Sequence, residues 1–128
     1  APLGFPAVSD FDLNTALRGR LTSASRPWHA GVFGTYEGFY TEMFALSGAK
    51  REMIGQLKRD IEDMGLIGTD METSALLVAA RILGARASTL CVATVDAHTQ
   101  DKISDAQMST AETELFEVAL TAITAVPA

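Results

Sequence analysis

The chain has 128 residues and a mass of 13.6 kDa, a length that supports one compact core. Hydrophobic residues make up 48% and charged residues 20%, and the mean hydropathy is +0.17, a composition that excludes a disordered chain. The net charge of −6 opposes nucleic-acid binding, because an acidic protein is repelled by phosphate backbones.

No segment is typical of a membrane span or a secretory leader. The longest apolar run, residues 75–80, is far shorter than the ~18 residues that cross a bilayer. We therefore expect neither membrane insertion nor secretion. Cys91 is the only cysteine and has no partner in the chain for a disulfide, so a reducing cytoplasm is the expected compartment.

The first half of the chain predicts two helices and one strand. Ser9 followed by Asp12 is typical of a capped helix start, and apolar spacing predicts a helix over about 10–22. Residues 28–33 are short, partly aromatic and bounded by Pro and Gly, which predicts a strand containing His29 as a core or edge residue. Residues 49–64 carry one apolar stripe and predict a surface helix.

The second half continues the alternation. Residues 65–68 predict a short strand, and 71–83 are apolar on nearly every face, which predicts a buried helix. Residues 88–95 are rich in β-formers without alternation, the pattern of a strand covered on both faces. A polar loop over 96–105 and a final amphipathic helix over 108–126 complete the chain.

This order predicts an α/β fold with a central, largely parallel or mixed sheet flanked by helices. In such folds, ligands bind outside the carboxyl ends of the strands. Three segments are thereby selected as candidate site elements: the loop 34–47, the turn 69–72 and the loop that begins at Asp96.

The turn 69–72 places two carboxylates at the start of a helix. Thr69 and Glu72 match the capping box that begins many helices. Asp70 and Glu72 are also acceptors suited to a polyol such as a ribose. Both interpretations stay open.

Thr94, Asp96 and His98 leave the predicted buried strand. Asp96 either begins a turn or, if its pKa is raised, donates a proton to a leaving group. His98 is a candidate base, or a metal ligand with Asp96 and Asp101, but three mixed ligands in one loop are a weak signal and no metal site is expected.

The loop 34–47 carries Phe39 and Tyr40, which either stack on a planar base or pack into the core. The glycines of this loop form no phosphate-binding fingerprint, and the chain has no nucleophile elbow.

Three segments together resemble a known family. Residues 1–11, residues 29–32 leading to Phe39 and Tyr40, and the run Asp-Met-Glu-Thr-Ser-Ala at 70–75 resemble, in order and spacing, the C-terminal half of uridine phosphorylases. The resemblance covers nearly all of the chain. It implies part of a three-layer nucleoside phosphorylase-like fold and a pentosyltransferase activity, in which phosphate cleaves a nucleoside to a free base and ribose 1-phosphate.

The resemblance also implies roles for individual residues. Met71 and Glu72 correspond to the residues that hold the ribose, and Phe39 to the aromatic that lies against the base. Asp96 corresponds, with a one-residue shift, to a catalytic proton donor. The candidate substrate-binding residues are therefore Phe39, Tyr40, Asp70, Met71, Glu72 and Thr94.

The chain departs from the family pattern in three respects. Met43 and Ala45 stand where uridine phosphorylases usually have a Gln and an Arg that read uracil, and Asp70 stands where a Glu is usual. The phosphate-binding loop and its arginines belong to the family's N-terminal half. We therefore expect residues 1–128 to be the C-terminal part of a single domain that is active only with its N-terminal part.

The expected partners are a nucleoside, inorganic phosphate as co-substrate and the N-terminal part, without any cofactor. The family implies dimers assembled into hexamers, and a role in pyrimidine salvage. Two alternatives remain: a nucleosidase that uses water in place of phosphate, and a non-catalytic relative that acts as a binding or oligomerisation module or has no function of its own.

Overall fold

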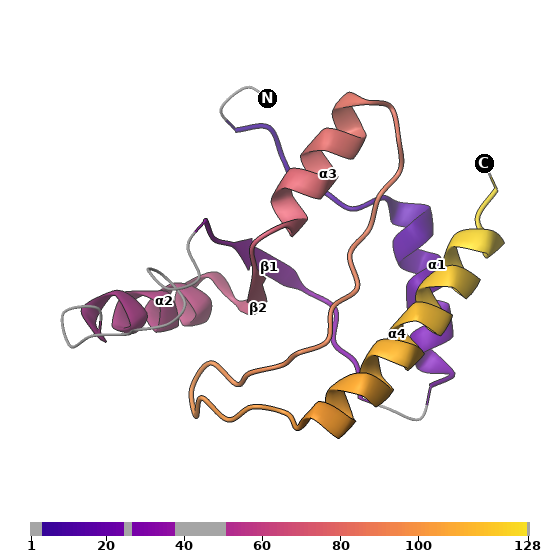
Figure 1. Ribbon diagram of the computed structural model, residues 1–128. Coiled ribbons are helices and arrows are strands. Elements are labelled where there is room, and N and C mark those ends of the chain that lie inside the picture. Colours follow the sequence, from indigo (N-terminus) through magenta and orange to yellow (C-terminus); the bar gives the residue numbers. More distant parts are fainter. Residues whose placement is uncertain (1–3, 25–26, 38–50, 128) are drawn as a thin grey trace. The chain divides into compact units, whose positions relative to one another are not determined.

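The computed structural model describes residues 4–24, 27–37 and 51–127 and contains four helices and two strands among them (Figure 1). The chain divides into two compact units. The first consists of Ala1–Trp28 and Ala75–Ala128, and the second of His29–Ser74.

The first unit is built on a pair of helices, α1 (Phe11–Thr22) and α4 (Asp105–Ala125). They lie side by side and run in opposite directions (Figure 1). Leu13 of α1 is 8% exposed and Ala122 of α4 is 1% exposed, so a small side chain on α4 permits close packing. Capping bonds fix both helix starts: the carboxylate of Asp10 accepts the Leu13 N–H, and Ser104 forms a capping box with Gln107.

The second unit contains β1 (Val32–Thr35), α2 (Arg51–Met64) and β2 (Leu66–Asp70), followed by the start of α3 (Thr73–Ile82). The two strands are parallel. Val32 pairs with Leu66, the register shifts by one residue, and the pairing ends at Thr35 with Asp70. Both strands therefore present their carboxyl ends at the same edge.

Two glycines permit this arrangement. Gly65 has φ +62° between α2 and β2, a left-handed conformation that other residues rarely adopt. At Gly34, a Cβ atom would lie 2.8 Å from Leu66 Cδ1, so glycine leaves room for the Leu66 side chain in its present position.

The predicted α/β class and all four helices are confirmed. The predicted strand over 28–33 is shifted, because β1 begins at Val32 and ends at Thr35. Gly34 lies inside this strand and does not terminate it. His29 is exposed and precedes the strand, so its predicted position inside the strand is wrong. The second strand extends past its predicted end at residue 68 to Asp70.

Two further expectations are corrected. Residues 88–95 form no strand in the part of the chain that the structure describes; their one ladder contact is an isolated bridge between Val95 and Lys102. Helix α3 is buried at Leu77, which is 5% exposed, whereas Ile82 is 59% exposed. The physical reason is shared: β-formers and all-round apolar helices need neighbouring segments to pair with and pack against.

Within the described ranges, no helix combines the length and the apolar character that crossing a membrane requires.

The position of the α1 cap is testable. Asp10→Ala removes the acceptor for the Leu13 N–H and is expected to lower the free energy of unfolding by about 1 kcal/mol. Ser9→Ala, the matched control at the cap that the sequence predicts, is expected to change it by less than about 0.5 kcal/mol. Urea unfolding followed by circular dichroism measures both, and a larger loss for Ser9→Ala contradicts the assignment.

Candidate functional site

The candidate site lies where β1 and β2 end. Parallel strands with aligned registers place their last residues side by side, here Thr35 and Asp70. The backbone continues the alignment, because the Tyr36 N–H donates to the Asp70 carbonyl over 2.8 Å. The chain then turns through Met71 and Glu72 before α3 begins at Thr73. This is the strand-end position at which α/β folds bind ligands.

The Asp70 carboxylate is engaged with neighbouring groups of the protein. Its Oδ1 accepts the Thr35 hydroxyl over 2.9 Å and the Thr73 N–H over 3.4 Å. Its Oδ2 accepts the Thr73 hydroxyl, and Thr73 is only 9% exposed. These bonds satisfy backbone and side-chain donors at the start of α3, as a helix-capping carboxylate does.

The side chains of Met71 and Glu72 are exposed to solvent. Met71 is 38% exposed, and the Glu72 side chain is also exposed. The Glu72 carboxylate accepts the Met71 N–H over 3.2 Å at Oε2. An ionised carboxylate accepts about four hydrogen bonds, so Glu72 retains capacity for hydroxyl donors from a ligand. The adjacent Met71 thioether offers a polarisable apolar surface.

The predicted capping box of Thr69 and Glu72 is wrong. Thr69 belongs to β2, which continues through Asp70, and the carboxylate that accepts the Thr73 N–H is that of Asp70. The strand extends further than its sequence pattern indicates because β1 supplies a partner as far as Thr35. The capping interpretation of this turn therefore applies to Asp70, which caps α3.

Thr94 and Asp96 lie in the first unit, in a loop closed by backbone bonds. The Ile103 N–H donates to the Thr94 carbonyl over 3.1 Å, and the Asp96 N–H donates to the Asp101 carbonyl over 2.9 Å. The Asp96 Oδ1 atom accepts the backbone N–H groups of His98 and Thr99, each over 2.8 Å. This is an Asx-type turn, the first of the two interpretations of Asp96.

These bonds lower the pKa of the Asp96 carboxyl. The backbone N–H of Thr99, and next that of His98, hold the pKa of the Asp96 carboxyl below its ordinary value, because they stabilise the ionised form. A proton donor needs a pKa shifted upward. In this arrangement, Asp96 is an acceptor, and its correspondence to a catalytic acid stays a prediction.

The aromatic loop cannot be placed in the same way. Phe39 and Tyr40, together with Met43 and Ala45, lie outside the described residues.

One residue of the candidate site was missed by sequence reasoning: Thr35, whose hydroxyl contacts Asp70. The only signal for Thr35 in the sequence is its position directly after Gly34. The sequence predicts that the strand ends before Gly34, whereas β1 continues to Thr35.

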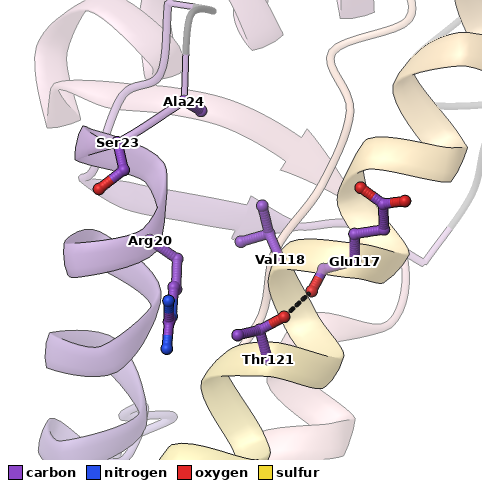
Figure 2. Close-up of a pocket in the computed structure, with 6 residues that line it drawn as sticks. All are labelled: Arg20, Ser23, Ala24, Glu117, Val118 and Thr121. Atoms are coloured by element: carbon purple, nitrogen blue, oxygen red, sulfur yellow. Dashed lines mark hydrogen bonds between the residues drawn. The ribbon is translucent and has the colours of Figure 1, made fainter.

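A separate groove of about 240 Å³ lies between α1 and α4 (Figure 2). Its hydroxyl groups donate within their own helices: Thr121 to the Glu117 carbonyl over 2.6 Å, and Ser23 to the Gly19 carbonyl over 3.3 Å. None of the predicted site residues lines it. Its lining residues are Arg20, Ser23, Ala24, Glu117, Val118 and Thr121.

The described residues contain no group of three or more His, Cys, Asp or Glu side chains placed to hold a metal ion.

Comparison with known proteins identifies the family. A family model described as "Phosphorylase superfamily" matches residues 1–124. The chain belongs to the phosphorylase superfamily. Over 110 residues, 84% of this chain, it is 31% identical to uridine phosphorylase of Escherichia coli (strain K12). It is 30% identical over the same length to the uridine phosphorylases of Klebsiella aerogenes and of Salmonella typhimurium.

The chain spans less than half the length of these relatives: the matched region covers 43% of each of them. The resemblance to nucleoside phosphorylases is thereby confirmed. The roles of individual residues in this superfamily member stay predictions.

The ionisation of Asp96 is testable by NMR titration of its side-chain carboxyl. We expect a midpoint below the ordinary value of about 3.9 in the folded chain and a return to that value in urea. Because the pKa is lowered on folding, ionised Asp96 stabilises the fold above the unfolded value, and this contribution is lost as the pH falls through the folded value. A folded midpoint at or above the unfolded one contradicts the Asx-turn assignment.

Proposed function

We propose that this chain is the C-terminal part of a nucleoside phosphorylase that cleaves the N-glycosidic bond of a nucleoside with inorganic phosphate. The superfamily match over residues 1–124 supports the proposal, and the exposed Glu72 carboxylate at the end of β2 supports it chemically. In the proposed reaction, a phosphate oxygen bonds to the anomeric carbon. The base leaves with the electrons of the broken C–N bond and takes up a proton, giving free base and ribose 1-phosphate.

Glu72 and Met71 carry the ribose in this proposal. Charge builds up on the ribose ring in an oxocarbenium-like transition state, and a carboxylate beside the ring stabilises that charge. A ribose hydroxyl donates to Glu72, while the Met71 thioether packs against the sugar. Asp70, whose carboxylate is occupied by Thr35 and Thr73, is not assigned to the sugar. Phe39 and Tyr40 are proposed to lie against the base.

The remaining parts of the proposal concern Thr94, Asp96 and the rest of the protein. We propose Thr94 as a further substrate contact, and Asp96 as an acceptor near the substrate in its ionised form. The N-terminal part is proposed to supply the phosphate ligands. The coverage of 43% of each relative and the exposure of large apolar side chains such as Leu76 and Phe116, at 49% and 63%, support a missing covering segment.

We further propose that the enzyme acts in the cytoplasm, in pyrimidine salvage, and as dimers assembled into hexamers. Phosphate is a co-substrate in this scheme, and no cofactor takes part. Met43 and Ala45 are apolar and lack the hydrogen-bonding groups that read a uracil edge, so we propose a base preference broader than uracil.

The proposed reaction is tested by incubating the full-length protein that carries residues 1–128 with uridine or inosine, with and without phosphate. We expect phosphate-dependent release of free base together with ribose 1-phosphate. Release of free ribose at an equal rate without phosphate would indicate a nucleosidase instead. If no nucleoside is cleaved, calorimetry with bases and nucleosides decides whether a non-catalytic binding module remains.

The role of Glu72 is tested by Glu72→Gln. Because a hydrogen bond to a charged acceptor is stronger than one to a neutral amide, we expect kcat/KM for nucleosides to fall by about tenfold to a hundredfold. Unfolding free energy should change by less than about 0.5 kcal/mol. Glu62→Gln, at an exposed position of α2, is the matched control and should retain activity. Equal activity of the two variants contradicts the assignment.

A further inference from the structure

We infer that Thr35 is a positioning residue: together with Asp70 it forms a clamp that holds the Met71–Glu72 turn in the conformation that presents Glu72. The hydrogen bonds that make up this Thr35–Asp70 clamp are properties of the fold. Its effect on catalysis rests on the proposed function.

A single hydroxyl connects three segments of the second unit. The Thr35 hydroxyl at the end of β1 donates to Asp70 Oδ1 over 2.9 Å. The Thr35 hydroxyl oxygen (Oγ1) also accepts the N–H of Ser74, in the first turn of α3, over 3.1 Å. Thr35 thereby contacts the residue before the Met71–Glu72 turn and a residue after it.

Asp70 closes the same turn from its other side. Its carboxylate accepts the N–H and the hydroxyl of Thr73, the first residue of α3. With the Thr35 hydroxyl, these donors occupy three of the about four acceptor positions of a carboxylate. The side chain is thus committed to protein donors, whereas Glu72 accepts from the Met71 N–H and is exposed.

The clamp has a definite physical effect on the turn between its ends. Two residues between fixed ends have few conformations, so little conformational entropy is lost when a ligand binds there. A misplacement of about 1 Å in a positioning group is enough to lower catalysis strongly. Loss of the Thr35 hydroxyl removes both the donor to Asp70 and the acceptor for Ser74, so that the turn is held only by the bonds of Asp70 to Thr73 and by the strand pairing.

Thr35→Val preserves the shape of the side chain and removes only its hydrogen bonds, whereas Thr35→Ser keeps the hydroxyl. In the full-length protein, we expect Thr35→Val to lower kcat/KM for nucleosides by about tenfold, and Thr35→Ser to retain most of the activity. A matched control, Thr121→Val on α4, removes a hydroxyl that donates to the Glu117 carbonyl and should leave activity unchanged.

A double-mutant cycle distinguishes positioning from general damage. If Thr35 acts through Glu72, Thr35→Val should lower kcat/KM by less than about twofold in a Glu72→Gln background, because the group it positions is already impaired. A further tenfold loss in that background, or no loss in the parent background, overturns the positioning role.

Hydrogen exchange tests the clamp without an activity assay. In Thr35→Val, the Ser74 amide is expected to exchange about tenfold faster or more, because its acceptor is gone, while amides in the middle of α4 keep their rates. Unchanged exchange at Ser74 overturns the clamp. If the parent protein cleaves no nucleoside, the proposed function is wrong, and so is the catalytic part of this inference. The hydrogen-exchange result at Ser74 tests the Thr35–Asp70 clamp independently of that outcome.

Discussion

The hydrogen bond from Thr35 to Asp70 is the interaction on which the candidate site depends. It joins the last residues of two parallel strands and extends, through Ser74 and Thr73, into the first turn of α3. Parallel strands cannot be joined by a tight hairpin, and here α2 lies between them in the chain. The two ends meet only because the register brings residues 35 and 70 opposite each other, which makes the geometry of the site a consequence of strand pairing.

Two aspartates of this chain show how the same side chain acquires different properties from its surroundings. Asp70 accepts side-chain hydroxyls as well as a backbone N–H, and links a strand end to a helix start. Asp96 accepts two backbone N–H groups from its own loop, which lowers its pKa because they stabilise the ionised form. In both cases the acceptor capacity is used for local structure. Glu72 lies between β2 and α3, and its exposed carboxylate accepts the Met71 N–H, so it keeps further acceptor capacity.

Few hydrophobic side chains are buried in the described parts of the chain, and many large ones are exposed. The hydrophobic side chains buried below about a tenth exposure in the described parts of the chain are Leu13, Leu77 and Ala122. The α1–α4 pair supplies a local core, while the outer face of α4 leaves Phe116, Leu120 and Ile123 exposed at 63%, 63% and 59%. Exposed apolar side chains of this size are the observation on which the proposal of a covering segment rests.

The sequence by itself determined the α/β class and the four helices, because helical periodicity and strand-end motifs are local signals. It also selected the turn 69–72 as a candidate site element, and the role of that turn stays a prediction. The sequence also carried the resemblance to nucleoside phosphorylases. It misplaced the α1 cap at Ser9 and ended β1 before Gly34, since a competing polar neighbour and a glycine are ambiguous without their spatial partners. Only the tertiary structure decided that Asp70 caps α3 and that Thr35 belongs to the site. The contact of Thr35 with Asp70 joins residues 35 positions apart, which no local pattern encodes, and the capping role of Asp70 follows from the pairing of β2 with β1 as far as this residue.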